Sequence, residues 1–159
     1  MIDKIKRAFE ILPTGPDRQW TEELKKRFIN LGREEGFRVY TTIAADSGQA
    51  GGEWLYDLCW LKYDQPKDES VEYPHLGEVV LAMESEWGDT GALIDDFHKL
   101  LQSTARYRLM IFQSKAPTIF LNYARANIAI YPHVPGSCYI FACYSNHEKR
   151  FFFEVITPE

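Results

Sequence analysis

The stretch from residue 78 to residue 101, EVVLAMESEWGDTGALIDDFHKLL, decides the fold because it joins a strand to the clearest helix in the chain. Its first part, Glu78 to Glu86, is mostly apolar and predicts a β-strand. Thr90 is expected to cap the helix that follows. One face of this helix is formed by Leu93, Ile94, Phe97, Leu100, Leu101 and Thr104. A strand followed by such an amphipathic helix predicts an α/β fold in which the helix covers a sheet.

Upstream of this stretch, the sequence predicts two helices and two strands. The first helix covers residues 2–12, and the second runs from Thr21, its expected cap, to Gly36, which ends it. The strands are expected from Phe37 to Ile43 and from Glu53 to Lys62, on either side of a glycine-rich loop at residues 48–52.

Downstream, the pattern predicts a fourth strand from Arg108 to Phe112, a helix from Pro117 to about Ile128, and a closing hairpin formed by Cys138 to Tyr144 and Arg150 to Ile156. Short loops between the first three strands favour an antiparallel meander, and a helix between the third and fourth permits a parallel crossover. We therefore expect a single α/β domain over residues 1–159, with a mixed central β-sheet flanked by helices and a C-terminal β-hairpin.

Composition limits the class of protein. The chain has 159 residues, of which 45% are apolar and 26% charged, as in ordinary globular domains. The longest apolar runs are only a few residues, and the charged N-terminus has no signal-peptide core, so we expect neither a membrane span nor secretion. Three cysteines cannot all pair within one chain, which favours a cytoplasmic protein with buried thiols over a disulfide scaffold or a zinc site.

The charge is distributed unevenly along the chain. The net charge is −5, but the segment from Asp46 to Asp96 holds thirteen acidic residues against Lys62 and Lys67, and both flanking segments are mildly basic. One interpretation is a solvated acidic face. The other is a carboxylate cluster that needs a divalent cation before any phosphate can approach.

Three carboxylates are candidates for such a cluster. Side chains two apart on a strand share a face, so Glu84 and Glu86 are expected to point the same way, beside the apolar Ala82. Asp57 is placed inside an otherwise apolar strand. Carboxylates among apolar neighbours are costly unless something neutralises them, and a hard cation does so. If the two strands pair, the three carboxylates converge. The alternative is that the glutamates are simply exposed and that Asp57 has a hydrogen-bonding partner.

The order helix, three strands, helix and strand, with Asp57 on the second strand and Glu84-Ser85-Glu86 at the end of the third, resembles the PD-(D/E)XK (restriction-endonuclease-like) nuclease superfamily. The resemblance covers residues 21–113. It implies an αβββαβ core in which Asp57 and Glu84 hold Mg²⁺ or Mn²⁺. In the family, a lysine two residues after the glutamate orients or activates the attacking water.

This chain departs from the family pattern because Glu86 occupies the lysine position. Glu86 would then act as a general base or as a third metal ligand. The resemblance offers Lys99 as the missing positive charge, since some members carry the lysine on the following helix. An ordinary surface ion pair with Asp95 or Asp96 is the alternative for Lys99. The candidate catalytic residues are therefore Asp57, Glu84, Glu86 and Lys99, and the first three are the candidate metal ligands.

Two functions follow from these observations. The first is a Mg²⁺-dependent nuclease that hydrolyses phosphodiester bonds in DNA, with DNA contacting residues 25–27 and the basic residues after Phe97. The second is a catalytically inactive nuclease-fold protein that serves as a protein-binding or inhibitor-type module. Its acidic centre and its aromatic residues Trp54, Tyr56, Trp60 and Trp87 would form the contact surface.

Overall fold

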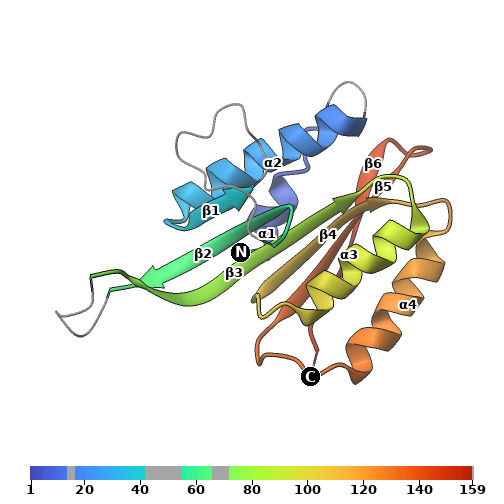
Figure 1. The fold of residues 1–159 in the computed structure, drawn as a ribbon. Helices are drawn as coiled ribbons and strands as arrows, with labels where there is room; N and C mark the ends of the chain where they lie inside the picture. The colour runs from blue at the N-terminus through green and yellow to red at the C-terminus, as the bar shows by residue number, and fades with distance from the viewer. Residues whose placement is uncertain (14–16, 42–54, 66–71, 159) are drawn as a thin grey trace.

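The computed structural model describes residues 1–13, 17–41, 55–65 and 72–158, which form one six-stranded sheet with helices on both faces (Figure 1). The strands are β1 (Arg38–Thr41), β2 (Leu58–Asp64), β3 (His75–Glu86), β4 (Tyr107–Gln113), β5 (Cys138–Ser145) and β6 (Arg150–Ile156). The helices are α1 (Ile2–Arg7), α2 (Asp17–Glu34), α3 (Thr90–Gln102) and α4 (Pro117–Ile130). The prediction of a mixed sheet flanked by helices is confirmed.

The strands lie in the sheet in the order in which they occur along the chain. β1, β2 and β3 form an antiparallel meander, β3, β4 and β5 run parallel, and β6 returns antiparallel to β5. The expected adjacency of the second and third strands, the parallel crossover through α3 and the closing hairpin are all present. The parallel strands β3, β4 and β5 therefore end at the same edge of the sheet.

Alternation along β3 divides the core between the two faces. Leu81 and Met83 belong to the cluster that packs against α1 and α2, and Ala82 belongs to the one that packs against α3 and α4. Phe97 and Leu100 of α3 are buried against the sheet, as their spacing predicts. The two helical layers thus hold β3 between them, and each layer can bring side chains to the end of this strand.

α2 begins earlier than expected, at Asp17, so Thr21 is not its cap but lies inside the helix. The helix approaches β2 so closely at Gly32 that an added Cβ would lie 2.5 Å from the indole nitrogen of Trp60. Only glycine fits such a contact. Gly36, with φ of +82°, ends the helical segment in the left-handed conformation, as its position predicts.

The structure corrects two other boundaries. β2 begins at Leu58, and Asp57 precedes it in a bend rather than lying inside the strand. The glycine-rich loop and the first residues of the predicted strand lie in residues 42–54, outside the described part of the chain. The cap of α3 is Asp89, whose carboxylate accepts the amides of Gly91 and Ala92, so Thr90 is the first residue of the helix. Asp89 competes better for this position because its carboxylate accepts two amides at the positive end of the helix dipole.

The ends of the chain also differ in detail from the prediction. α1 ends at Arg7 rather than at residue 12, because a turn starts at Ala8. α4 begins at Pro117 as predicted and extends two residues further, to Ile130.

All three cysteines are free and buried, as expected. Within the described ranges, no helix has the length and apolar character needed to cross a membrane.

Candidate functional site

Asp57 and Glu84 meet at one end of the sheet. Antiparallel pairing places Leu58, the first residue of β2, opposite Met83 of β3, so the residues beside this pair are neighbours. The Asp57 amide lies 3.4 Å from Glu84 Oε2, and Asp57 Oδ2 accepts the amide of Ser85 at 3.0 Å. The two residues are therefore neighbours at this end of the sheet, and each carboxylate faces a backbone amide of the other segment.

The Glu84 side chain is only 4% exposed and lies on the α3 side of the sheet. Its Oε1 is buried and has no hydrogen-bond partner among the described residues; the nearest cation there is Lys99 Nζ, at 3.6 Å. Burial, followed by the charges of Asp57 and Asp96, raises the pKa of Glu84 from 4.5 to about 8. A buried carboxyl group with an unsatisfied oxygen is the most unusual feature of this sheet end.

Lys99 lies on α3 with a side chain that is 53% exposed, as the apolar stripe of the helix predicts. Its Nζ is 2.7 Å from Asp96 Oδ1 and 3.6 Å from Glu84 Oε1. The hydrogen bond to Asp96 is the main cause that raises the pKa of Lys99, so the amine stays charged. The expected ion pair with a helix neighbour is confirmed for Asp96, and the same amine also lies near Glu84 of the candidate site.

Glu86 behaves differently from Glu84. Its Oε1 accepts the amides of Gly88 at 2.9 Å and Asp89 at 3.2 Å, which holds the turn between β3 and α3. Across the described ranges, no three His, Cys, Asp or Glu side chains are placed so that they could hold a metal ion together. The structure thus places Asp57 and Glu84 at one end of the sheet and directs one oxygen of Glu86 into the turn.

Lys25 is a member of the site that the sequence interpretation missed. Its Nζ donates to Asp57 Oδ1 at 2.9 Å, and its side chain is only 6% exposed. The sequence assigned Lys25 to a DNA-contacting surface together with Lys26 and Arg27. The guanidinium of Arg27 is also engaged within the protein, since it donates to the carbonyl of Ala8. Only Lys26 of these three is exposed.

The residues of the site fit a hard divalent cation. Such ions prefer oxygen ligands, and Mg²⁺ is commonly held by one or two carboxylates, with water and phosphate completing its shell. Asp57 and Glu84 supply two carboxylates at the same end of the sheet, with the Asp57 amide 3.4 Å from Glu84 Oε2, and the buried Oε1 of Glu84 accepts no hydrogen bond from a described residue. A cation at this oxygen would compensate the cost of burying it.

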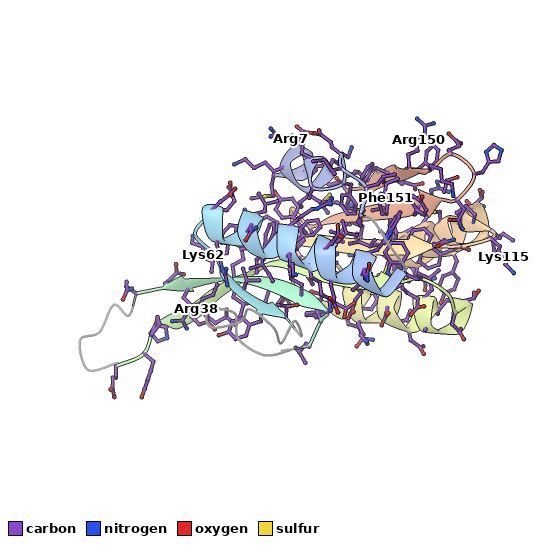
Figure 2. All side chains as sticks on the ribbon, turned by 90° about the horizontal axis from the view of Figure 1, so that it is seen from above. Arg7, Arg38, Lys62, Lys115, Arg150 and Phe151 are labelled. Carbon is purple, nitrogen blue, oxygen red and sulfur yellow. The ribbon has the colours of Figure 1, made fainter. Side chains whose placement is uncertain are left out.

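A groove of about 970 Å³ lies at the edge of the sheet where β3, β4 and β5 end. It is bounded by the β3–α3 turn with Trp87 and Asp89, by Lys115 before α4, and by His147 in the β5–β6 turn. Figure 2 shows Lys115 at the end of the molecule opposite to Lys62. The turn whose amides Glu86 accepts, at Gly88 and Asp89, forms one wall of the groove. Open α/β sheets bind ligands at this edge, beyond the carboxyl ends of their parallel strands.

The chain was also compared with known proteins, and a function has to be inferred from the position of the site at the end of β3, because these comparisons give no relationship to another protein. No protein-family model matches the chain, and comparisons with curated proteins and with solved structures also find no match.

Proposed function

We propose that this chain is a divalent-metal-dependent nuclease that hydrolyses phosphodiester bonds in DNA. The observation that supports the proposal is the meeting of Asp57, Glu84 and Lys99 at one end of the sheet. Two carboxylates with a nearby lysine are the groups that metal-assisted phosphodiester hydrolysis requires. The order α2–β1–β2–β3–α3–β4, on which the resemblance to PD-(D/E)XK nucleases depends, agrees with this proposal.

Each side chain has a separate role in the proposed reaction. Asp57 and Glu84 would hold Mg²⁺ or Mn²⁺, which when bound polarises the scissile phosphate and lowers the pKa of a water molecule. Lys99 takes the place of the lysine that the motif lacks. Its exposed amine can contact the phosphate and the attacking water, and it stays charged because Asp96 stabilises it. Glu86 keeps the turn beside the site in shape.

The groove next to the site gives the substrate a path. It contains an indole from Trp87 and polar side chains from two loops, among them Lys115 and His147. Aromatic rings and polar groups of this kind suit stacking and hydrogen bonding with nucleotides. One strand of a nucleic acid that lies in the groove would pass the carboxylate pair at the β3–α3 turn.

One observation favours the second candidate function, a protein-binding module that keeps the fold without the chemistry. The outer face of α4 exposes Ile119, Tyr123 and Ile130, with Ile119 at 73% and Ile130 at 83% exposure. Such a patch on a helix is typical of a protein contact. The aromatic surface expected from the sequence is not its basis, because Trp60 is fully buried and Trp87 lines the groove beside the β3–α3 turn instead. Trp54 lies outside the described residues.

A plasmid-nicking assay combined with a Mn²⁺ melting titration tests the proposal. Wild type should nick DNA only with Mg²⁺ or Mn²⁺ and should melt higher with Mn²⁺. Asp57→Asn and Glu84→Gln should lower the nicking rate by ~100-fold or more and abolish the Mn²⁺ shift. The matched control is Glu34→Gln, an exposed carboxylate at the far end of α2, which should change neither. Equal nicking by Glu84→Gln, or no Mn²⁺ shift in wild type, would leave the protein-binding function as the better account.

A further inference from the structure

Lys25 occupies an unusual position for a lysine. It lies on α2, on the opposite face of the sheet from Lys99, with its side chain 6% exposed and its Nζ 2.9 Å from Asp57 Oδ1. Lysines are almost never buried to this extent without a paired charge. The carboxylate of Asp57 is therefore bound to a buried cation of the protein itself.

Asp57 does not depend on Lys25 for its position. Its Oδ2 accepts the amide of Ser85 at 3.0 Å, and its carbonyl accepts the hydroxyl of Thr41 at 2.9 Å. Its own amide faces Glu84 Oε2 at 3.4 Å. These contacts, made to β1 and β3, hold the backbone and one carboxylate oxygen. The other carboxylate oxygen is the one that faces Lys25, and it belongs to the pair that would hold the metal.

From this arrangement we infer that Lys25 is a built-in counter-ion that competes with the divalent cation for Asp57 and lowers the metal affinity of the site. The inference rests on the metal site of the proposed function and adds a residue that sets its affinity. A positive charge next to a ligand oxygen repels an incoming cation, and the repulsion is strong because Lys25 is shielded from water. The same charge stabilises Asp57 when no metal is present.

This role differs in a measurable way from a purely structural one. If Lys25 only held Asp57 in place, its removal would weaken metal binding together with the fold. If Lys25 competes with the metal, its removal lowers the stability of the metal-free protein but tightens metal binding. A gain in metal affinity is a change that lost positioning does not produce.

The experiment measures binding of Mn²⁺ alone to the full chain by calorimetry and by thermal melting. Lys25→Met and Lys25→Gln remove the charge, and the matched control Arg33→Met removes an exposed charge from the same helix. The glutamine variant keeps a polar group at Asp57 in case the methionine variant folds poorly. We expect both Lys25 variants to bind Mn²⁺ on the order of tenfold more tightly than wild type, with a larger melting shift, and Arg33→Met to bind like wild type.

The remaining outcomes separate this inference from the function on which it rests. If wild type binds one Mn²⁺ and the Lys25 variants bind it equally or more weakly, the counter-ion role is wrong and the metal site stands. If wild type and both Lys25 variants fail to bind Mn²⁺, the metal site and the counter-ion role are both wrong. Binding by the Lys25 variants must also be lost when Asp57→Asn is added, because otherwise the ion occupies some other position.

Discussion

The two faces of the sheet each bring one lysine to one carboxylate, but the two pairs are built differently. On the α2 face, Lys25 is 6% exposed and lies 2.9 Å from Asp57. On the α3 face, Lys99 is 53% exposed and lies 3.6 Å from Glu84, with Asp96 as its closer partner. The first pair is short, with a buried lysine and a partly exposed carboxylate, and the second is long, with an exposed lysine and a buried carboxylate.

This difference in exposure distinguishes a lysine that stabilises the fold, Lys25, from a lysine that can contact a substrate, Lys99. A shielded ion pair with one hydrogen-bonded geometry holds its partners and is costly to break. An exposed lysine keeps its rotamer freedom and contributes little to stability, yet it can reach a phosphate or a water molecule. We therefore assign the chemical role to Lys99 and the affinity-setting role to Lys25, and the following variants test that division.

The largest effect is expected for Lys99→Met, which removes the exposed lysine. The nicking rate should fall by ~100-fold or more, since this is the scale on which positioned acid–base and charged groups contribute. The free energy of unfolding should change by less than ~0.5 kcal/mol, because the side chain is 53% exposed. Single-turnover nicking and urea unfolding measure the two quantities. Lys62→Met, an exposed lysine of β2, is the control and should leave both unchanged.

Asp57→Ala should have the next largest effect, this time on stability. It removes the carboxylate that binds the buried Lys25 and the amide of Ser85, so the metal-free protein should lose about 2 kcal/mol of unfolding free energy. Lys99→Ala, on the other face, should cost far less in the same urea measurement. Equal losses for these two variants would contradict the division between the two faces.

The pH dependence of stability should come from the α3 face. Because the pKa of Glu84 is raised to about 8, the folded protein keeps a proton that the unfolded chain releases near pH 4.5. Raising the pH from about 5 to about 8 should therefore lower the stability of the metal-free protein, by at most about 1.4 kcal/mol per pH unit from this group. Glu84→Gln should remove this part of the slope, and Glu34→Gln should not. Identical slopes for wild type and Glu84→Gln in chelator-treated buffer would show that Glu84 titrates normally.

The smallest effect is expected for Glu86→Ala. The variant loses the acceptor of the Gly88 and Asp89 amides, which should cost about 1 kcal/mol because the turn is exposed and water replaces part of the bond. If the metal is held by Asp57 and Glu84, the Mn²⁺ melting shift should persist. A lost shift in Glu86→Ala, without loss of the fold, would restore the third carboxylate as a ligand.

The strands and helices that position this site could be predicted from apolar spacing. The role of Glu86 in the turn after β3 could not. Alternation placed Glu84 on the same face as Ala82, and the structure shows that this face packs against α3. It also placed Glu86 beside Glu84. The strand ends at Glu86, however, and the free amides of the following turn draw its carboxylate to themselves. Strand periodicity contains no information about such a terminal hydrogen bond.

The ion pair of Lys25 is a second feature that the sequence interpretation missed, although the helix pattern does indicate that Lys25 is buried. Lys25 is four residues after Thr21 and three before Phe28, so it shares the helix face that packs on the sheet. A lysine on that face predicts a buried partner of opposite charge. That Asp57 is the partner depends on the bend before β2, which brings a residue distant in sequence to the helix. No local pattern specifies that contact.

The dispersal of the site over four elements has a consequence for synthesis of the chain. Lys25, Asp57, Glu84 and Lys99 come from α2, the bend before β2, β3 and α3, so no short fragment contains the set. Chains emerge from the ribosome N-terminus first, and contacts between distant residues form only after both partners have been made. A nascent chain therefore lacks the complete set until α3 has emerged. Truncated translation products that end before Lys99 would be inert toward the nucleic acid that we propose the finished protein cleaves.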